Sequence, residues 1–270
     1  MIEGVQRLLL GRPLPTAEAE RERLNRPGAL GAFGLDALSS VAYGPDEILY
    51  VLVLAGAAGT RLDLPIALAI TALLAIVVTS YRQTIFAYPK GGGSYTVARE
   101  NLGTGAGLLA AAALMVDYLT TVAVSVTAGV EALVALVPAL DPHRVALDMV
   151  CIVVLMLVNL RGVREAGALF VLPTYVFISS LAVLLGWGLL RLATGALPPL
   201  HAVPTHATEG VSIFLVLRAF AGGCTAMTGV EAIANGVPAF KEPSARNAAG
   251  TLVTLAVMLG ALFLGVAGLG

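Results

Sequence analysis

The sequence predicts an all-α integral membrane protein, and three observations lead to that fold class. Of 270 residues, 58% are hydrophobic and only 12% are charged, which is about half the charge of a typical soluble domain. The mean hydropathy is +0.89. The apolar residues also lie in long runs, and a bilayer core about 30 Å thick needs roughly 20 such residues for each helical span. These features exclude a water-soluble fold.

Seven apolar runs are expected to cross the membrane. They occupy residues 29–57, 64–86, 104–137, 145–160, 166–192, 211–235 and 248–270. Residues 1–28 are polar and rich in arginine, and Pro13, Pro15 and Pro27 lie among them. We expect this segment to be a cytoplasmic N-terminal arm.

The basic residues predict the orientation of the chain. With the N-terminus inside, the cytoplasmic segments hold twelve basic residues: Arg7, Arg12, Arg21, Arg23, Arg26, Arg82, Lys90, Arg99, Arg161, Arg164, Lys241 and Arg246. The outside segments hold three: Arg61, Arg144 and Arg191. Because Lys and Arg are retained on the cytoplasmic side, this asymmetry predicts a multi-pass protein of the cell (plasma) membrane with a cytoplasmic N-terminus. The net charge of −1 is uninformative about nucleic-acid or acidic partners. The expected partners are membrane lipid and a small cation substrate, and no nucleic-acid partner is expected.

The first and sixth runs are expected to be interrupted helices. Pro45 follows Gly44 in mid-membrane and removes a backbone hydrogen bond, so the first helix is expected to unwind around residues 40–44. The sixth run contains the segment Gly222–Gly229, whose small and hydroxyl-bearing residues weaken a helix. Each glycine cluster alone is equally consistent with close helix packing. Two interruptions five helices apart favour a transporter built from inverted repeats, with its binding site at the interruptions.

Three acidic residues lie within the apolar runs, where a charged side chain is costly unless it has a partner or a function. Asp36 precedes the first interruption, Glu231 follows the sixth, and Asp117 lies near the middle of the third run. Each charge in the membrane interior costs about 2.5–3.5 kcal/mol. Apart from Arg82 and Arg191, which are assigned to the ends of their runs, Arg218 is the one basic residue within the runs. Carboxylates without matching bases bind a cation, hold protons, or do both in turn. This pattern is typical of proton-coupled cation transport.

Hydroxyl groups are available to complete a cation site. Thr121 and Ser125 follow Asp117 at intervals of four residues, which places all three on one helical face beside Tyr118. The alternative interpretation is a stripe of interhelical hydrogen bonds. Further oxygen ligands are expected from the backbone carbonyls of residues 39–43 and from the hydroxyls of Tyr43 and Thr228.

Four segments carry a resemblance to a known family: GLDALSSVAYGPDEILY at 34–50, SYRQTIFAYPKGGGSYTVARENLG at 80–103, VDYLTTVAVS at 116–125 and TAMTGVEAIANGVPAFKEP at 225–243. The sequence resembles the amino acid–polyamine–organocation superfamily and, within it, the bacterial KimA-type potassium importers. The resemblance implies a LeuT-like five-plus-five inverted-repeat fold, here truncated to about seven transmembrane helices, with helices 1 and 6 discontinuous. Residues 29–192 would form the first five-helix repeat and residues 193–270 the start of the second, with the remainder absent.

The resemblance also implies a function, namely potassium import coupled to protons. It implies a substrate site at Asp36, Tyr43, Asp117, Tyr118, Thr121, Ser125 and Thr228, with potassium held by Asp36, Tyr43, Asp117, Ser125 and Thr228. Glu231 is the implied candidate for proton coupling. We expect no enzymatic activity and no cofactor, with potassium ion and proton as the transported species. A homodimer is expected only together with the C-terminal part that family members carry.

Two other functions stay open at this point. An amino acid permease of the same superfamily would hold a substrate carboxylate at the break in helix 1, which Asp36 and Tyr43 disfavour. A non-transporting membrane receptor or regulatory subunit is compatible with the hydropathy, although it has no need for three unpaired carboxylates. The glycine-rich segment at residues 87–103 lacks the preceding strand of a phosphate-binding loop, and we expect a flexible intracellular connection there.

Overall fold

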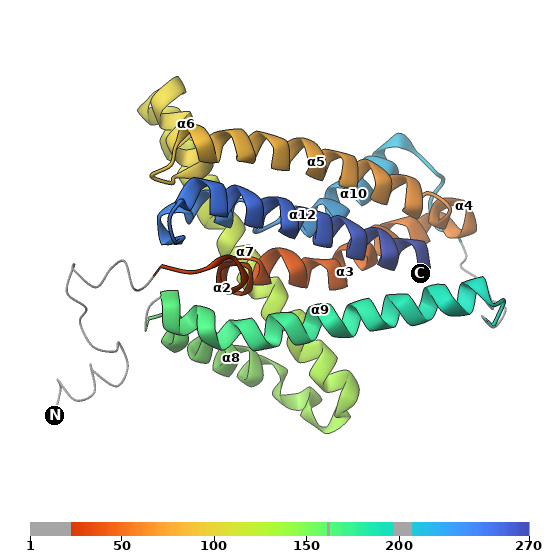
Figure 1. Ribbon diagram of the computed structural model, residues 1–270. Helices are drawn as coiled ribbons and strands as arrows, with labels where there is room; N and C mark the ends of the chain where they lie inside the picture. The colour runs from red at the N-terminus through yellow and green to blue at the C-terminus, as the bar shows by residue number, and fades with distance from the viewer. Residues whose placement is uncertain (1–22, 161–162, 197–206, 270) are drawn as a thin grey trace.

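Helices form almost all of the regular structure in the computed structural model, which describes residues 23–160, 163–196 and 207–269 (Figure 1). The one β-type pairing in these described ranges is an isolated bridge between Leu24 and Phe240. The prediction of an all-α fold is therefore confirmed. In chain order the helices are α2 (Arg26–Phe33), α3 (Leu35–Leu52), η2 (Val53–Ala55), α4 (Gly56–Thr60), α5 (Asp63–Ala87), α6 (Gly93–Leu102), α7 (Thr104–Leu136), η3 (Pro138–His143), α8 (Arg144–Asn159), α9 (Val163–Ala193), α10 (Ile213–Gly223), η4 (Cys224–Met227), α11 (Ala232–Asn235), η5 (Val237–Ala239) and α12 (Ser244–Leu269).

The first helix begins earlier than the hydropathy predicts. Asn25 caps α2, because its side chain accepts a hydrogen bond from the backbone N–H of Gly28, and a proline occupies the first turn. α2 starts at Arg26, within the last three residues of the expected polar arm at residues 1–28. Residues 1–22 of that arm lie outside the described residues.

The expected unwinding around residues 40–44 is wrong. α3 is helical from Leu35 to Leu52 with Pro45 buried inside it. A proline removes one hydrogen bond, here the bond to the carbonyl of Val41, and α3 is held on either side by packing against α10 and α12. The bend between α2 and α3 lies instead at Gly34, just before Asp36.

The glycine-rich segment at 87–103 is mostly helical, so the expected flexible connection is wrong as well. Gly91, Gly92 and Gly93 have positive φ angles of 81°, 118° and 36° and turn the chain into α6. α6 then packs along α7 and ends at Leu102. The glycines lie at the turn, and the sequence pattern did not predict the short helix that follows it.

Five helical segments in the described part of the chain are long and apolar enough to cross a membrane: Leu35–Thr60, Asp63–Ala87, Thr104–Leu136, Gly167–Ala193 and Ser244–Leu269. They coincide with five of the seven expected runs. The runs at 145–160 and 211–235 correspond to shorter elements, namely α8 with 16 residues and α10 followed by η4. The chain is thus a multi-pass helical membrane protein.

The helices are arranged so that α3 lies inside the bundle. α5 and α12 run side by side, α3 lies beside α10 and α12, and α2 packs against α9 (Figure 1). α7 contacts α3 and α8 and crosses behind α3 (Figure 1). This arrangement encloses the start of α3 and the turn after α10.

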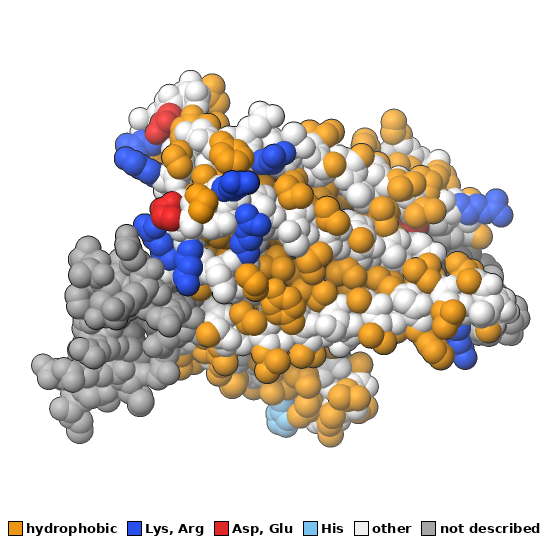
Figure 2. Space-filling view, viewed as in Figure 1, with side chains coloured by type: hydrophobic (Ala, Val, Ile, Leu, Met, Phe, Trp, Pro, Cys, Tyr) orange, Lys and Arg blue, Asp and Glu red, His pale blue; other side chains and the backbone are white. Residues whose placement is uncertain are grey.

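The surface separates into an apolar flank and a basic end. Apolar side chains cover the flank of the helices, and Lys and Arg side chains gather at the end where α5 stops and α12 begins (Figure 2). Large apolar residues exposed on the flank include Leu119 of α7, Val153 of α8 and Val183 of α9. A flank of this kind is stable in contact with lipid hydrocarbon and not in water.

Candidate functional site

The chain after α10 leaves the helical conformation at the level of the bundle interior. α10 ends at Gly223, a 3-10 turn follows at Cys224–Met227, Thr228 is extended and α11 starts only at Ala232. The hydroxyls of Thr225 and Thr228 donate to the carbonyls of Gly222 and Thr225, at 2.8 and 2.9 Å. Such local bonds compete with the helical ladder. They explain why this small and hydroxyl-rich segment turns where the sequence predicts an interruption.

Asp36 packs directly against this turn. Gly229 has a φ of +76°, and a Cβ atom at that position would lie 2.6 Å from Asp36 Oδ2. Both the backbone conformation and the space therefore require glycine. Asp36 Oδ1 is buried and has no hydrogen-bond partner among the described residues. The structure thus brings the first acidic residue to the interruption that follows α10.

A cluster of three hydroxyls joins the two segments. Ser40 is 0% exposed, and its Oγ donates to the carbonyl oxygen of Asp36 at 3.0 Å. The same Oγ lies 3.1 Å from the hydroxyl of Tyr43 and 3.1 Å from Oγ1 of Thr228. Tyr43 and Thr228, which come from separate parts of the chain, are thereby brought to one place.

Glu231 lies at the other side of the turn and is held from α5. The hydroxyl of Tyr81 donates to Glu231 Oε2 at 3.1 Å and lies 3.1 Å from the hydroxyl of Ser94. Glu231 Oε1 is buried and has no hydrogen-bond partner among the described residues. One carboxylate oxygen is thus fixed and the other remains available to a ligand or a proton.

A cavity of about 250 Å³ lies at this turn, and Asp36 packs against Gly229 in its wall. The cavity is lined by Val77, Tyr81, Asp117, Cys224, Met227, Thr228, Gly229 and Glu231. Asp117 enters it from α7. Both Asp117 and Glu231 lie within Coulombic range of Asp36. Neither ion pair in the described ranges, Arg23–Glu242 or Arg144–Asp141, involves these carboxylates.

The remaining predicted residues on α7 do not line the cavity. Thr121 is 8% exposed, and Ser125 has a buried hydroxyl with no hydrogen-bond partner in the described residues. Tyr118 is 36% exposed, and its hydroxyl accepts a hydrogen bond of 2.9 Å from Asn235 Nδ2 of α11. The predicted face of α7 therefore points inward, with Asp117 at the cavity.

The sequence patterns did not identify two residues of this site, Ser40 and Tyr81. Ser40 lies within the segment 34–50, and Tyr81 lies within the segment 80–103. A serine or a tyrosine in an apolar run is more often a packing or interface residue than a ligand. Only their distances to Thr228 and Glu231 distinguish them.

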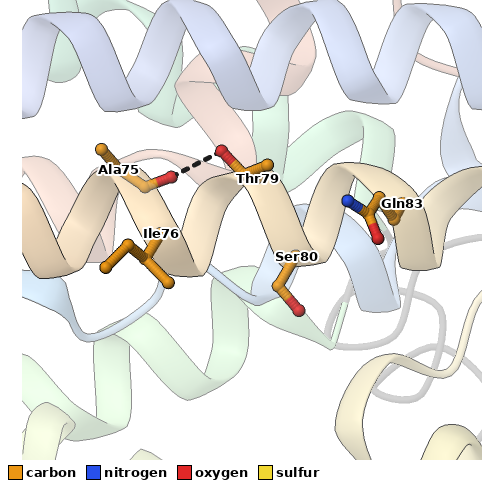
Figure 3. Close-up of a pocket in the computed structure, with 5 residues that line it drawn as sticks. All are labelled: Ala75, Ile76, Thr79, Ser80 and Gln83. Carbon is orange, nitrogen blue, oxygen red and sulfur yellow. Dashed lines mark hydrogen bonds between the residues drawn. The ribbon is translucent and has the colours of Figure 1, made fainter.

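The close-up in Figure 3 shows a larger hollow that does not share this chemistry. It measures about 470 Å³, and its lining residues come from one helix, α5: Ala75, Ile76, Thr79, Ser80 and Gln83. These five residues include no titratable group. It also lacks a second element to enclose a ligand, so the acidic cavity is the stronger candidate.

The cavity is lined by the carboxylate residues Asp117 and Glu231 and by the hydroxyl residues Tyr81 and Thr228. In the described residues no group of three His, Cys, Asp or Glu side chains converges to hold a metal ion. The oxygens that line the cavity belong to carboxylates and hydroxyls. These groups replace the hydration shell of a weakly held cation.

The fold and the site together define a class, that of multi-pass helical membrane proteins with an acidic cavity between their helices. Comparison with known families places the chain within it. The chain belongs to the amino acid permease family, whose model matches residues 36–269.

The curated relatives that the chain matches are named as potassium transport proteins. The chain is 44% identical over 268 residues to the potassium transporter KimA of Bacillus subtilis (strain 168), a match that covers 98% of this chain and 44% of that protein. It is 38% identical over 116 residues to the probable potassium transport system protein Kup 1 of Geobacter sulfurreducens, covering 42% of this chain and 18% of that protein. The probable Kup protein of Thiobacillus denitrificans is 34% identical over 129 residues, covering 47% of this chain and 20% of that protein. The chain thus spans less than half the length of these relatives.

Proposed function

We propose that this chain is part of a secondary transporter that imports potassium coupled to protons across the cell membrane. The observation that carries the proposal is the cavity between α7 and the turn after α10. It brings Asp117 and Glu231 together beside Asp36, without a basic partner among the described residues. Several buried negative charges in a membrane protein need a cation or protons to compensate them.

In this proposal the potassium ion is bound between α3, α7 and the turn after α10. Asp36, Tyr43, Asp117 and Thr228 supply oxygens, and Tyr118, Thr121 and Ser125 form the surrounding polar face on α7. Ser40 orients the Tyr43 and Thr228 hydroxyls through its contacts of 3.1 Å. Glu231, with one oxygen held by Tyr81 and the other free, carries the coupled proton.

The proposed architecture is the LeuT-like arrangement of two inverted five-helix repeats. Residues 29–192 correspond to the first repeat and residues 193–270 to the start of the second. The interruptions at Gly34 and at residues 224–231 support this correspondence, because a pair of interrupted helices in equivalent positions is the pattern of such transporters. The names of the relatives support potassium as the substrate.

An amino acid permease of the same fold is the second candidate, since the family model carries that description. A permease must neutralise the carboxylate of its substrate with a base or with freed backbone N–H groups. Here α3 stays helical through residues 40–44, and Asp36 would repel a carboxylate. Potassium is therefore the better substrate for this cavity.

The decisive experiment expresses the complete gene product in bacteria that lack their own potassium uptake. We expect it to restore growth at low potassium, and we expect rubidium to compete with potassium uptake. A mixture of the common amino acids should not compete. If amino acids compete and potassium depletion makes no difference, the permease function replaces the potassium function.

The proposed orientation, with a cytoplasmic N-terminus, has its own test. In a background with Cys151 and Cys224 changed to alanine, Thr60→Cys should react with an impermeant thiol reagent added outside intact cells. Lys90→Cys, exposed at the other end of α5, should react only after the cells are opened. The reverse pattern would invert the topology.

A further inference from the structure

A groove with three arginines lies at the basic end of the molecule, and it shares no lining residue with the acidic cavity. It measures about 550 Å³ and is lined by Arg26, Arg82, Phe86, Arg246, Ala249, Gly250 and Val253. The arginines come from α2, α5 and α12. In the view of Figure 2 this is the end at which Lys and Arg side chains gather.

One of the three guanidinium groups is held in a fixed position. Arg26 Nε donates to Asn247 Oδ1 at 3.0 Å, and Asn247 in turn donates from Nδ2 to the carbonyl of Lys241 at 2.8 Å. The guanidinium lies over Gly250, where a Cβ atom would be 3.1 Å from Arg26 Cζ. With Nε occupied, its terminal nitrogens remain to donate to an anion, and a planar guanidinium suits the oxygens of a phosphate.

The positive charge of this groove is not neutralised within the described chain. The ion pairs in the described ranges are Arg23–Glu242 and Arg144–Asp141, and neither includes an arginine of the groove. The residues that line the groove include no acid. Three guanidinium groups that share one groove repel one another until an anion binds between them.

An apolar channel continues from the arginines along α5 and α12. It measures about 280 Å³, shares Arg82 and Val253 with the groove, and is further lined by Thr71, Leu74, Ala75, Val78, Thr79, Ala256 and Val257. The hydroxyl of Thr79 donates to the carbonyl of Ala75 at 2.7 Å, as the dashed line in Figure 3 shows. Thr71 donates in the same way to Ala67 at 2.9 Å. With both hydroxyls satisfied by the backbone, the channel wall is effectively apolar.

The length of the channel matches one leaflet of a bilayer. From Arg82 back to Thr71, α5 extends about 16 Å at 1.5 Å per residue, and half of the hydrocarbon core is about 15 Å. Both helices are long enough to cross a membrane. At the basic end, Phe86 is 53% exposed and Val253 40% exposed, so the channel opens on the lipid-facing surface.

We propose that this groove and channel bind one anionic phospholipid, with its phosphate among Arg26, Arg82 and Arg246 and an acyl chain between α5 and α12. Basic pockets between membrane helices bind anionic headgroups in this manner. The proposal rests on the membrane placement of α5 and α12 and not on the transported substrate.

The test measures lipid binding to the purified complete gene product in neutral detergent by native mass spectrometry. The probes are phosphatidylglycerol, phosphatidylcholine with the same chains, and inorganic phosphate. Phosphatidylglycerol should bind at least about fivefold more tightly than phosphatidylcholine, and inorganic phosphate should not displace it. Arg82→Gln and Arg246→Gln should each weaken phosphatidylglycerol binding by about fivefold, whereas Arg82→Lys should retain most of it.

Two further variants separate this site from general attraction to a charged protein. Arg61→Gln removes an exposed arginine at the opposite end of α5 and should leave binding unchanged. Ala75→Trp fills the channel without changing charge and should weaken phosphatidylglycerol binding. Equal losses in Arg61→Gln and Arg82→Gln, equal binding of the two lipids, or displacement by inorganic phosphate would each overturn the proposal.

Discussion

The helices α3 and α8 are both apolar and similar in length, with 18 and 16 residues, yet their surroundings differ completely. Nine residues of α3 are buried, whereas α8 has no buried residue. α3 lies between α10, α12 and α5, while α8 packs mainly along α7 and α9. Hydropathy therefore identifies both as membrane helices and does not indicate which one carries the site.

The difference lies in the polar and small residues rather than in the apolar ones. α3 presents Asp36, Ser40 and Tyr43 toward the turn after α10, and Gly44 and Pro45 are buried within it. α8 presents exposed branched residues such as Val150 and Val153. A helix that must contact other helices closely needs small and hydrogen-bonding residues, whereas a helix facing lipid needs only apolar bulk.

The largest effect is expected from neutralising the acids at the cavity. Asp36→Asn and Asp117→Asn each remove a charge that compensates the cation while they preserve the side-chain shape. We expect potassium uptake by the complete gene product to fall about a hundredfold or more, from the loss of roughly 3 kcal/mol. Radiolabelled rubidium uptake at matched membrane expression measures this loss.

The matched control is Asp46→Asn, which removes an exposed acid from the same helix, α3. It should keep uptake within about twofold, because a surface substitution changes the free energy by no more than about 0.5 kcal/mol. Equal losses at positions 36 and 46 would show that α3 acts through its overall charge and not through the cavity.

The next effect concerns the glycine that lets Asp36 approach. Gly229→Ala places a methyl group against the Asp36 carboxylate at a backbone φ of +76°, which should cost about 1–3 kcal/mol and reduce uptake. Gly129→Ala on α7 has no atom within 4 Å of the new methyl and should be neutral or stabilising by up to about 1 kcal/mol. Thermal unfolding of both variants in detergent compares their stabilities. Equal stabilities would indicate that Gly229 is only a flexible linker.

Glu231 and Tyr81 are expected to affect coupling more than binding. Glu231→Gln removes the group that carries the proton, so uptake should lose most of its dependence on an imposed proton gradient while rubidium affinity changes less. Tyr81→Phe removes the donor to Glu231 Oε2 and should produce a weaker version of the same change. Uptake into proteoliposomes with and without a pH gradient separates the dependence on the proton gradient from the affinity for rubidium. Full gradient-driven accumulation in Glu231→Gln would assign the proton to another carboxylate.

The smallest of these effects is expected at Ser40. Ser40→Ala removes the contacts to Tyr43 and Thr228 and should raise the half-saturating potassium concentration by about fivefold, from the loss of about 1 kcal/mol. Ser39→Ala removes a hydroxyl that bonds only the carbonyl of Asp36, at 2.8 Å, and should have little effect. Similar changes in both variants would indicate that these serines only stabilise the start of α3.

Much of the fold was predictable because the insertion of a segment into a membrane depends on the summed hydropathy of its residues. The runs at 64–86 and 104–137 differ by one residue at most from the ends of α5 and α7. The errors occur where neighbours override a local pattern. Packing against α10 and α12 keeps α3 helical through Pro45, and Asn25 starts α2 within a segment that is polar by composition.

The sequence predicted the acidic residues of the candidate site but only some of its hydroxyl residues. The pattern identifies Asp36, Asp117 and Glu231 because a charge in an apolar run costs free energy and is rarely present without a function. Ser40 and Tyr81 cost little in a membrane helix, so nothing in the pattern separated them from ordinary packing residues. The hydroxyl of Tyr43 reaches Thr228 only through Ser40, which no spacing along the chain indicates.

By itself, then, the sequence determined that the chain is a helical membrane protein with excess acid in its interior, since hydropathy and charge are properties of each residue. The tertiary structure decided which acids share a cavity. Asp36 meets Gly229, and Tyr81 meets Glu231, across separations of nearly 200 and about 150 residues. Contacts over such separations depend on how α3, α5 and α10 pack together, and the packing of membrane helices is set by close fit and hydrogen bonds rather than by hydropathy.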